Sequence, residues 1–437
     1  MKISVFGCEL TGLVTSAALA QTGNEVMALP IGVVKVEDLK KGILPREEPG
    51  LETLVKSQYD EERLFFEADW SQGVAYAEVL FLSMPSWNID RAEDIVNLVA
   101  DTAEKDLIVV NQSTFPIGTA DRFKQTIKDG FTRRGVQAKV AVIAMPEFMS
   151  EGSAIKDFTH PDRVVLGGDC EEAIATIRDV MRPFNYAVDQ VKVMSTRAAE
   201  YTKYAVNALL ATRMSLVNEL ANNAEHFDID MEQVRQGLGS DGRVGFSYLY
   251  PGCGFGGPSF AEDVKTLVST LESKGYDADL LKTVLTNNDS QKEVLFRKAW
   301  RYFHNNLKGK TIAVWGLSFK PNTATVDNAP SLKTIEALVA QGANVVAYDP
   351  KAKSAFQRYW GESRPGVSYV DDMYQALDGA DALMVLTEWK HFWNPDYARM
   401  KEMMALPVIF DGRNIYDLNI MKSKGFEYFG VGRGSFI

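Results

Sequence analysis

Short apolar runs rich in β-branched residues alternate with segments of helical periodicity along the first 190 residues of the chain. We predict strands at residues 3–6, 25–29, 79–83, 107–111, 139–144 and 163–166. The alternation restarts at residue 308, with strands predicted at 311–316, 344–350, 382–387 and 408–410. Strands that alternate with helices form βαβ units with parallel strands, so the pattern predicts an α/β fold with two Rossmann-like domains.

The middle of the chain follows a different pattern. Residues 196–227 contain neither Pro nor Gly and carry apolar residues at helical spacing, which predicts one helix about 45 Å long. A helix of this length is more often a scaffold or a dimer element than a ligand site. We therefore predict an N-terminal Rossmann domain at 1–195, a central helical dimerisation segment at 196–300 and a C-terminal Rossmann-like domain at 308–437.

Composition narrows the class of protein. The 437 residues are 46% hydrophobic and 24% charged, as in globular proteins, and no apolar run has the length of a transmembrane helix. The N-terminus lacks the apolar stretch of a signal peptide, so we expect a cytoplasmic protein. The three cysteines and four histidines are scattered, which argues against a disulfide framework and a metal site. The net charge of −11 argues against nucleic acid or an anionic membrane as the main partner.

The segment from Gly7 to Gly12 follows the first predicted strand and opens a helix, where a dinucleotide-binding G-x-G-x-x-G fingerprint is expected. The second glycine of that motif lets the backbone approach the pyrophosphate, and here it is Glu9. Glu9 brings bulk and negative charge to this position. Because a helix N-terminus attracts anions by about 0.3–1 kcal/mol, the Glu9 carboxylate is itself a candidate occupant of the site.

The second predicted strand ends in Pro30, where a Rossmann domain that binds NAD carries an acidic residue for the adenosine ribose. Proline has no side-chain acceptor. The loss of both the second glycine, at Glu9, and the ribose-binding acid, at Pro30, indicates a weakened cofactor site. The alternative is a Rossmann domain that binds NAD in a divergent way.

A family resemblance rests on many short blocks in a fixed order. Residues 251–263, PGCGFGGPSFAED, resemble the loop PGxGFGGSCFPKD of UDP-glucose dehydrogenases. Further matching blocks are LPREEPGL at 44–51, STFPIGT at 113–119, PEFMSEG at 146–152, PDRVV at 161–165, GLSFKPNT at 316–323, YDP at 348–350, TEW at 387–389 and DGRN at 411–414. The resemblance covers essentially the whole chain, which is identified as a member of the nucleotide-sugar (UDP-glucose/GDP-mannose) dehydrogenase family.

The resemblance implies a reaction in which the 6-hydroxymethyl group of a UDP-sugar is oxidised to a carboxylate by two hydride transfers to NAD. In such enzymes a cysteine thiolate adds to the intermediate aldehyde, and the thioester formed later is hydrolysed. A Lys and an Asn stabilise the oxyanion, an Asp and a Glu handle protons, and a Thr positions water. The matching positions in this chain are Lys203, Asn207, Asp263, Glu147 and Thr114.

The position of the cysteine nucleophile is Ser259. An alcohol has a far higher pKa than the ~8.5 of a thiol, and no neighbouring His is present in the sequence to act as its base. Two other charged positions depart from the family, since Glu262 replaces a Lys and Asp327 replaces a cofactor-contacting Arg.

The positions implied to bind substrate are largely retained. Arg243 matches an Arg that reaches the substrate of a neighbouring subunit, and Lys320 and Arg413 match uridine- and phosphate-binding positions. The resemblance also assigns substrate contacts to Glu151, Phe255, Gly256 and Gly257.

Our leading hypothesis is a pseudoenzyme of the UDP-glucose 6-dehydrogenase type. It binds a UDP-sugar as a homodimer, binds NAD weakly or not at all, and pairs with or regulates an active paralogue in polysaccharide biosynthesis. One alternative is an active UDP-sugar 6-dehydrogenase with a divergent NAD site. A second alternative is a structural subunit that binds neither ligand.

Overall fold

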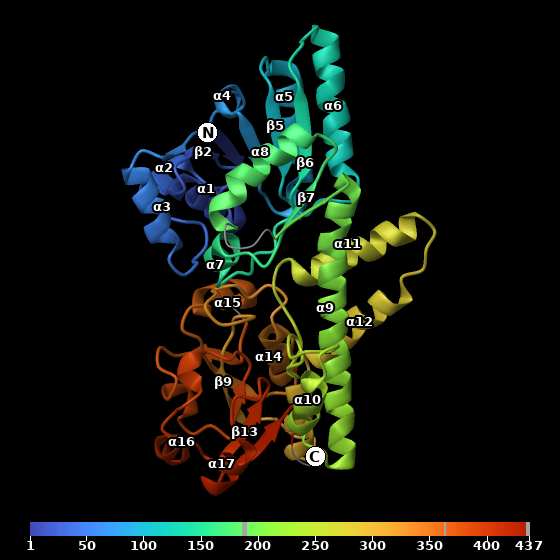
Figure 1. Cartoon of the computed structure of the whole chain (residues 1–437). Coiled ribbons are helices and arrows are strands. Elements are labelled where there is room, and N and C mark those ends of the chain that lie inside the picture. Colours follow the sequence, from blue (N-terminus) through green and yellow to red (C-terminus); the bar gives the residue numbers. More distant parts are fainter. Residues whose placement is uncertain (186–189, 362–363, 434–437) are drawn as a thin grey trace. The chain divides into compact units, whose positions relative to one another are not determined.

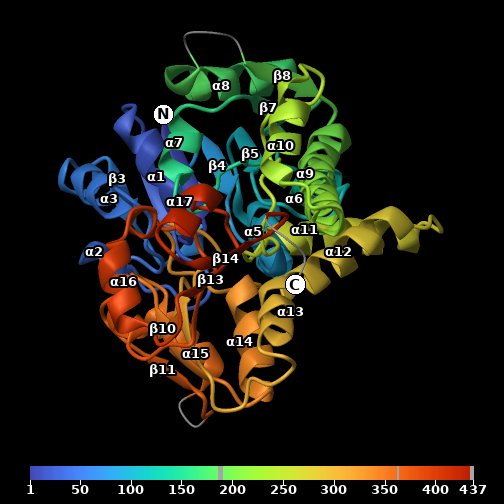
Figure 2. The ribbon, with the colours of Figure 1, turned by 90° about the horizontal axis from the view of Figure 1, so that it is seen from below.

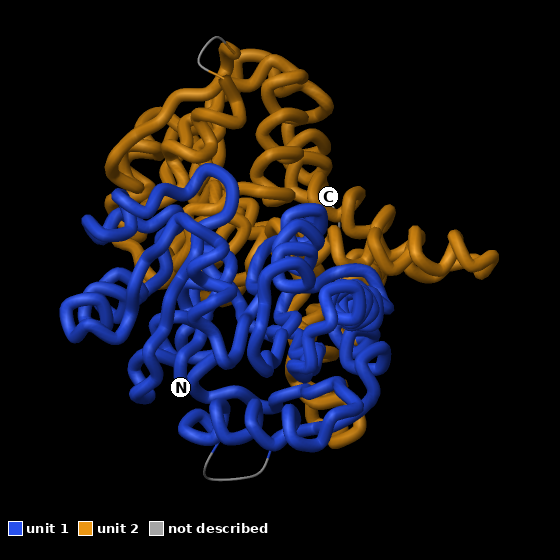
Figure 3. Tube along the Cα trace, turned by 90° about the horizontal axis from the view of Figure 1, so that it is seen from above, with its two compact units in different colours: residues 1–205 blue, residues 206–437 orange. Residues whose placement is uncertain are grey.

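The computed structural model describes residues 1–185, 190–361 and 364–433 (Figure 1). The chain forms two compact units, Met1–Ala205 and Val206–Ile437, which are coloured separately in Figure 3 and described one at a time below. Both units are α/β with mainly parallel sheets, so the predicted fold class is confirmed.

The N-terminal unit is built on an eight-stranded sheet with the order β3-β2-β1-β4-β5-β6-β7-β8. All neighbouring strands are parallel except the pair β6 and β7. The strands are β1 Lys2–Phe6, β2 Glu25–Leu29, β3 Leu64–Phe66, β4 Val79–Leu82, β5 Leu107–Asn111, β6 Val140–Ala144, β7 Val164–Gly167 and β8 Val191–Met194. Strands β3 and β8 are absent from the sequence prediction, and each lies at an edge of the sheet.

Helices cover both faces of this sheet and create two apolar layers. One layer includes side chains of α1, α3, α7 and α8, and the other includes side chains of α4, α5 and α6. The helices of this unit are α1 Leu10–Gln21, α2 Val36–Lys40, α3 Leu51–Asp60, α4 Trp70–Tyr76, α5 Ile89–Thr102, α6 Thr119–Arg134, α7 Ala154–Thr159 and α8 Glu171–Met181, with the short η1 Ser86–Asn88 and η2 Arg182–Phe184. The parallel order places the loops after β1, β2, β4 and β5 at one edge of the sheet, where α/β proteins bind ligands.

The predicted long helix is α9, Thr196–Ala224, and it is followed by η3 Glu225–Phe227. The prediction of a helix over 196–227 is therefore confirmed, apart from the tighter last turn. Among the described residues, no helix combines the length and the apolar character needed to cross a membrane.

The C-terminal unit contains an all-parallel six-stranded sheet with the order β11-β10-β9-β12-β13-β14 (Figure 2). Its strands are β9 Thr311–Trp315, β10 Asn344–Tyr348, β11 Val367–Tyr369, β12 Ala382–Val385, β13 Val408–Asp411 and β14 Glu427–Gly430. Its helices are α10 Met231–Ser240, α11 Phe260–Ser273, α12 Asp279–Gln291, α13 Val294–Tyr302, α14 Pro330–Ala340, α15 Lys353–Trp360, α16 Tyr397–Met403 and α17 Leu418–Ser423, with η4 Gln375–Leu377 and η5 Lys390–Phe392. This second Rossmann-like sheet confirms the restart of the βα pattern after residue 308.

Candidate functional site

The first and third glycines of the phosphate loop are required by the packing of the chain against itself. Gly7 leaves β1 with φ +121°, and a Cβ atom at this position would lie 1.9 Å from the carbonyl oxygen of Ser83. A Cβ atom at Gly12, in the first turn of α1, would lie 2.0 Å from the carbonyl oxygen of Gly7. Both glycines are therefore explained without any cofactor.

Glu9 occupies the N-cap position of α1, but its carboxylate makes no capping hydrogen bond. Its Oε2 atom instead lies 3.6 Å from Nε of Arg46, which belongs to the loop before α3. The other end of the same guanidinium, Nη1, lies 3.9 Å from Oε2 of Glu151. Glu9 thus does not cap the helix as an internal anion would. It forms one side of an ion-pair triad with Arg46 and Glu151.

Pro30 follows β2, and its carbonyl oxygen accepts a hydrogen bond of 3.4 Å from the indole nitrogen of Trp70. A cavity of about 420 Å³ opens next to it, at the carboxyl ends of β2 and β3. We call it the β2 cavity. It is lined by Pro30, Gly32, Val34, Lys35, Val36, Glu37, Ala68, Trp70 and Arg91.

Three catalytic-type positions lie in the N-terminal unit, and two of them are in contact. The Nζ atom of Lys203, on α9, donates to the backbone oxygen of Glu147 at 2.6 Å and lies 3.4 Å from its Oε1. The two side chains are only 9% and 17% exposed, so water screens this pair weakly. Thr114, which follows β5, accepts at its backbone carbonyl a hydrogen bond from the Tyr204 hydroxyl.

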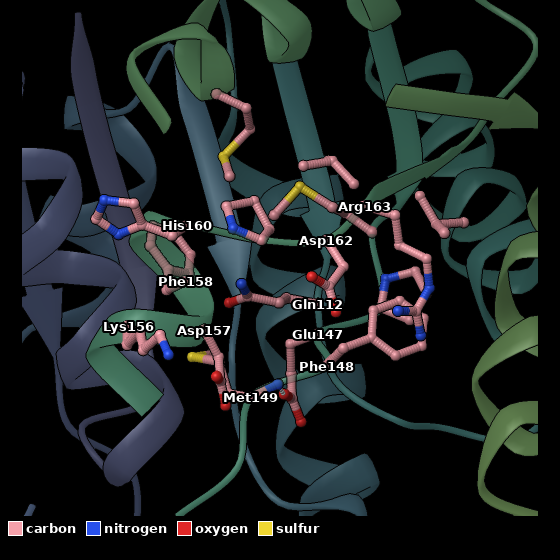
Figure 4. Close-up of a pocket in the computed structure, with 16 residues that line it drawn as sticks. Gln112, Glu147, Phe148, Met149, Lys156, Asp157, Phe158, His160, Asp162 and Arg163 are labelled. Atoms are coloured by element: carbon pink, nitrogen blue, oxygen red, sulfur yellow. Dashed lines mark hydrogen bonds between the residues drawn. The ribbon is translucent and has the colours of Figure 1, made fainter. Parts of the chain in front are cut away.

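Glu147 also borders a cavity of about 250 Å³ in this unit, which is shown in Figure 4. Gln112 lies near Glu147 in this view, and its Oε1 accepts a hydrogen bond of 2.9 Å from the Thr15 hydroxyl. The guanidinium of Arg163 lies 4.0 Å from the ring centre of Phe148. Sequence analysis did not identify this cavity, although the PEFMSEG and PDRVV blocks supply part of its lining.

The remaining catalytic-type positions lie in the C-terminal unit. Nδ2 of Asn207 donates to Oδ2 of Asp263 at 2.7 Å, and Asp263 is buried. Ser259 is the exposed N-cap residue of α11, and its hydroxyl makes no capping hydrogen bond. Glu262, in the first turn of the same helix, pairs with Lys265 at 2.7 Å. The nucleophile position therefore holds an exposed alcohol beside two carboxylates.

The glycine-rich loop before α11 is held by the side chain of Asn288, which lies on α12. Its Oδ1 accepts from the Phe255 nitrogen at 2.8 Å, and its Nδ2 donates to the Phe255 oxygen at 3.0 Å. Gly257 donates its N–H to the backbone oxygen of Asp327 at 2.8 Å. Gly256 is packed against the same segment, since a Cβ atom there would lie 2.7 Å from the Asn328 oxygen. This loop is thus fixed by contacts that sequence analysis did not anticipate.

Arg413 follows β13 and is turned into the C-terminal unit. Its Nε donates to the Leu386 oxygen at 2.8 Å and lies 3.1 Å from Oε2 of Glu388. The preceding turn is fixed by Asp411, which accepts from the Arg413 nitrogen at 2.9 Å and from the Tyr428 hydroxyl at 3.0 Å. Burial raises the pKa of the Asp411 carboxyl.

Two other predicted substrate positions are less enclosed. The ammonium of Lys320 lies 5.4 Å from the ring centre of Phe319. Arg243 is 90% exposed and forms a two-point contact with Asp241, at 3.1 and 2.7 Å. Within the described residues, no group of three or more His, Cys, Asp or Glu side chains is arranged to hold a metal ion.

Three models of the UDP-glucose/GDP-mannose dehydrogenase family match the chain. The NAD binding domain matches residues 1–185, the central domain matches 197–290 and the UDP binding domain matches 313–418. The chain is 40% identical to a UDP-glucose 6-dehydrogenase of Pseudomonas aeruginosa, with 99% of this chain and 98% of that protein covered. It is 36% identical to the UDP-glucose 6-dehydrogenase YwqF of Bacillus subtilis, with the same coverage of 99% and 98%.

A solved structure gives the same result. A UDP-glucose dehydrogenase from the hyperthermophilic archaeon Pyrobaculum islandicum superimposes with a TM-score of 0.88 at 28% identity, with 99% of this chain and 98% of that chain covered. The ordered sequence blocks, the two Rossmann-like sheets and the match of all three domain models agree. The chain therefore belongs to the UDP-glucose/GDP-mannose dehydrogenase family.

Proposed function

We propose that this protein binds a UDP-sugar but does not carry out the standard NAD-dependent oxidation of the 6-hydroxymethyl group to a carboxylate. The observation that carries the proposal is Ser259 at the position of the nucleophile, exposed at the start of α11. The two carboxylates in the first turn of α11 have other partners, since Glu262 pairs with Lys265 and Asp263 accepts a hydrogen bond from Asn207. An alcohol without a base is a poor nucleophile, so the thioester route of the family is closed.

UDP-sugar binding is supported by the C-terminal unit, which matches the UDP binding domain of the family. We assign nucleotide contacts to Lys320 and Arg413. The double hydrogen bond from Asn288 to Phe255 holds the adjoining loop in a fixed conformation. A loop that is ordered before the ligand arrives loses less conformational entropy on binding, which favours retained affinity.

The N-terminal unit matches an NAD binding domain, but we propose that NAD binds weakly or not at all. Glu9 replaces the glycine whose absent side chain admits the pyrophosphate, and its carboxylate is held in the triad with Arg46 and Glu151. Pro30 supplies no side-chain acceptor for the ribose. Asp327 stands where the family carries an Arg that contacts the cofactor, so the charge at this position is reversed. The residues at these positions therefore do not fit NAD.

We also propose a homodimer through α9. Leu209, Leu216 and Leu220 are 70%, 54% and 40% exposed, and their spacing of seven and four residues places them on one face of the helix. An exposed apolar stripe on a long helix is typical of an interface. The exposed Arg243 matches a position that acts across subunits in this family. In this proposal the chain consists of an N-terminal Rossmann domain at 1–195, a central dimerisation segment at 196–300 and a C-terminal Rossmann-like domain at 308–437.

In this proposal the protein acts as a binding or scaffold subunit beside an active paralogue in polysaccharide biosynthesis. A second candidate is an active enzyme limited to the oxidation of the alcohol to an aldehyde, a step that needs no thiol. The retained Lys203–Glu147 and Asn207–Asp263 contacts favour this second candidate. A structural subunit that binds neither ligand is the third.

Separate calorimetric titrations with UDP-glucose and with NAD discriminate these functions. We expect saturable binding of UDP-glucose and no measurable heat with NAD. Tight NAD binding would favour the active enzyme, and the absence of binding with either ligand would favour the structural subunit. Because the sugar itself is not fixed by the sequence, UDP and UDP-N-acetylglucosamine should be titrated in parallel.

A further inference from the structure

Four side-chain amides lie around the glycine-rich loop of the C-terminal unit. We call them the amide network. Asn218 and Asn222 lie on α9, and Asn288 and Gln291 lie on α12. Three of them are buried, since Asn218, Asn288 and Gln291 are 4%, 3% and 4% exposed. A buried amide is normally hydrogen-bonded, so the partners of these side chains show what the network holds in place.

The network holds the loop at Gly252 as well as at Phe255. The Gly252 nitrogen donates to Oδ1 of Asn218 at 2.8 Å, and Nε2 of Gln291 donates to the Gly252 oxygen at 2.8 Å. Side chains thus bind both backbone polar groups of Gly252, in the same way as Asn288 binds both of Phe255. The loop is therefore fixed at two points, one of which involves α9 and α12 together.

The amide of Gln291 has one orientation in this network. Its Oε1 atom accepts a hydrogen bond of 2.8 Å from Nδ2 of Asn222. Nε2 is therefore the end that faces the Gly252 oxygen, and only this end of the amide is a donor. Asn222 thus supports the contact between Gln291 and the loop without touching Gly252 itself.

Gly252 lies directly against the segment that carries Arg413. A Cβ atom at Gly252 would lie 2.9 Å from the Gly412 oxygen and 3.6 Å from Nη1 of Arg413. The next residue, Cys253, donates its N–H to the same Gly412 oxygen at 2.9 Å. A Cβ atom at Gly412 would in turn lie 2.9 Å from Sγ of Cys253. Because the two segments pack so closely, a shift of Gly252 would change the surroundings of the Arg413 guanidinium.

We propose that Asn218 and Gln291 are positioning residues for the nucleotide of the UDP-sugar, because they hold Gly252 where it supports Arg413. They act through the loop backbone and through Gly412, and neither side chain has to contact the ligand. A guanidinium that is aligned before the nucleotide arrives loses less conformational entropy on binding. The inference rests on the proposed binding of a UDP-sugar, and it extends the site to two residues outside the matching sequence blocks.

The test combines substitutions in the network with a substitution of Arg413. Gln291→Met and Asn218→Leu keep the approximate size of each side chain but remove its hydrogen bond to Gly252. In calorimetric titrations of the full-length protein with UDP, each should weaken binding by about fivefold to tenfold. In an Arg413→Ala background the same substitutions should weaken UDP binding by less than about twofold, because residues that act through Arg413 are coupled to it.

Asn287→Ala is the matched control. Asn287 precedes Asn288 on α12, and its Nδ2 donates to Oε2 of Glu219 on α9 at 3.2 Å, so this amide joins the same two helices but binds Glu219 instead of the loop. UDP affinity should be unchanged in this variant. Urea unfolding of every variant identifies any that has lost its fold.

Hydrogen exchange provides a second measurement that needs no ligand. The Cys253 N–H, which donates to the Gly412 oxygen, should exchange faster in Gln291→Met and in Asn218→Leu than in the unmutated protein. Its exchange should be unchanged in Asn287→Ala.

Equal losses of UDP affinity with and without Arg413→Ala would overturn the inference, because the network would then not act through Arg413. Unchanged UDP affinity in both Gln291→Met and Asn218→Leu would overturn it alone and leave the proposed function intact. A lack of UDP binding by the unmutated protein would refute the proposed function and this inference with it. Faster exchange at Cys253 in the variants would in that case show that the network orders the loop but serves no nucleotide.

Discussion

Restoring the nucleophile alone should not restore the oxidation. We expect Ser259→Cys to form no NADH from UDP-glucose, because the cofactor positions are also altered. The exposed cysteine would be available for chemistry, but Glu9, Pro30 and Asp327 would still weaken NAD. We therefore expect the complete oxidation to the carboxylate only in a fourfold variant that adds Glu9→Gly, Pro30→Asp and Asp327→Arg.

The magnitude follows from the contacts at each position. A lost charged hydrogen bond typically costs about 1–3 kcal/mol, and each 1.4 kcal/mol is a tenfold change in affinity. The loss of NAD affinity caused by Glu9 is reduced by Arg46, because the Arg46 guanidinium lies 3.6 Å from the Glu9 carboxylate and offsets part of its charge. Glu9→Gly removes the repulsion together with the contact to Arg46, which keeps its contact with Glu151. The changes at Glu9, Pro30 and Asp327 together weaken NAD binding by several orders of magnitude. The free energies of contacts that lie close together are not strictly additive.

The assay follows the absorbance of NADH with UDP-glucose and millimolar NAD. The triple variant that keeps Ser259 is the control for the cofactor site, and it should at most perform the step from alcohol to aldehyde. Robust turnover by the unmutated protein or by Ser259→Cys alone would refute the reasoning about the cofactor site. Calorimetry with NAD on the same variants shows whether a failure lies in binding or in chemistry.

Four further predictions concern assembly, substrate, pH and the loop. Light scattering at micromolar concentration should give a dimer, and Leu216→Glu on the exposed face of α9 should give a monomer of unchanged helicity. Arg413→Ala should weaken UDP-glucose binding by about 1–3 kcal/mol in titrations, with denaturant unfolding as the check, because the change also removes the contact with the half-buried Glu388. Glu200 accepts hydrogen bonds from the Gly118 and Ala120 nitrogens, and burial raises its pKa above the ordinary 4.5. Folding therefore favours the protonated form of Glu200. The resulting contribution to the free energy of unfolding is fully present below pH 4.5 and is lost as the pH rises through the raised pKa. Glu200→Gln should flatten that part of the profile of unfolding free energy against pH. Gly12→Ala should destabilise the N-terminal unit by about 1–3 kcal/mol through overpacking, whereas Glu9→Gly should change its unfolding free energy by less than about 1 kcal/mol. A similar loss for both substitutions in urea unfolding would contradict our account of the loop.

The sequence predicted the interior of both sheets and missed their edges. The four strands absent from the prediction are β3, β8, β11 and β14, and they are the outermost strands of the two sheets. Each contains only three or four residues. An edge strand has a neighbour on one side only and is often short, so it carries less of the continuous apolar run by which buried parallel strands are recognised.

The sequence motifs gave candidate site residues by their positions along the chain, but they did not predict which side chains those residues contact. The phosphate-loop motif singled out Glu9, and the family blocks singled out Phe255 and Arg413, but none of these patterns indicated their partners, which are distant in sequence. Arg46 lies 37 residues beyond Glu9, and Asn288 lies 33 residues beyond Phe255. Such pairs depend on how helices and loops fold back on the sheets, and no local periodicity encodes them.

In the phosphate loop, the glycines that backbone packing requires are distinct from the glycine that a cofactor would require. Gly7 and Gly12 must lack side chains because backbone atoms lie where their Cβ atoms would be. The middle position has no such constraint, since it accommodates the Glu9 side chain with φ −77° and ψ −173°, an ordinary extended conformation. A Rossmann domain can thus keep most of its fingerprint for packing alone while it loses the glycine that serves the pyrophosphate. The positions that report on cofactor and chemistry are those whose side chains the fold leaves free to vary, and in this chain Glu9, Pro30 and Ser259 are of that kind.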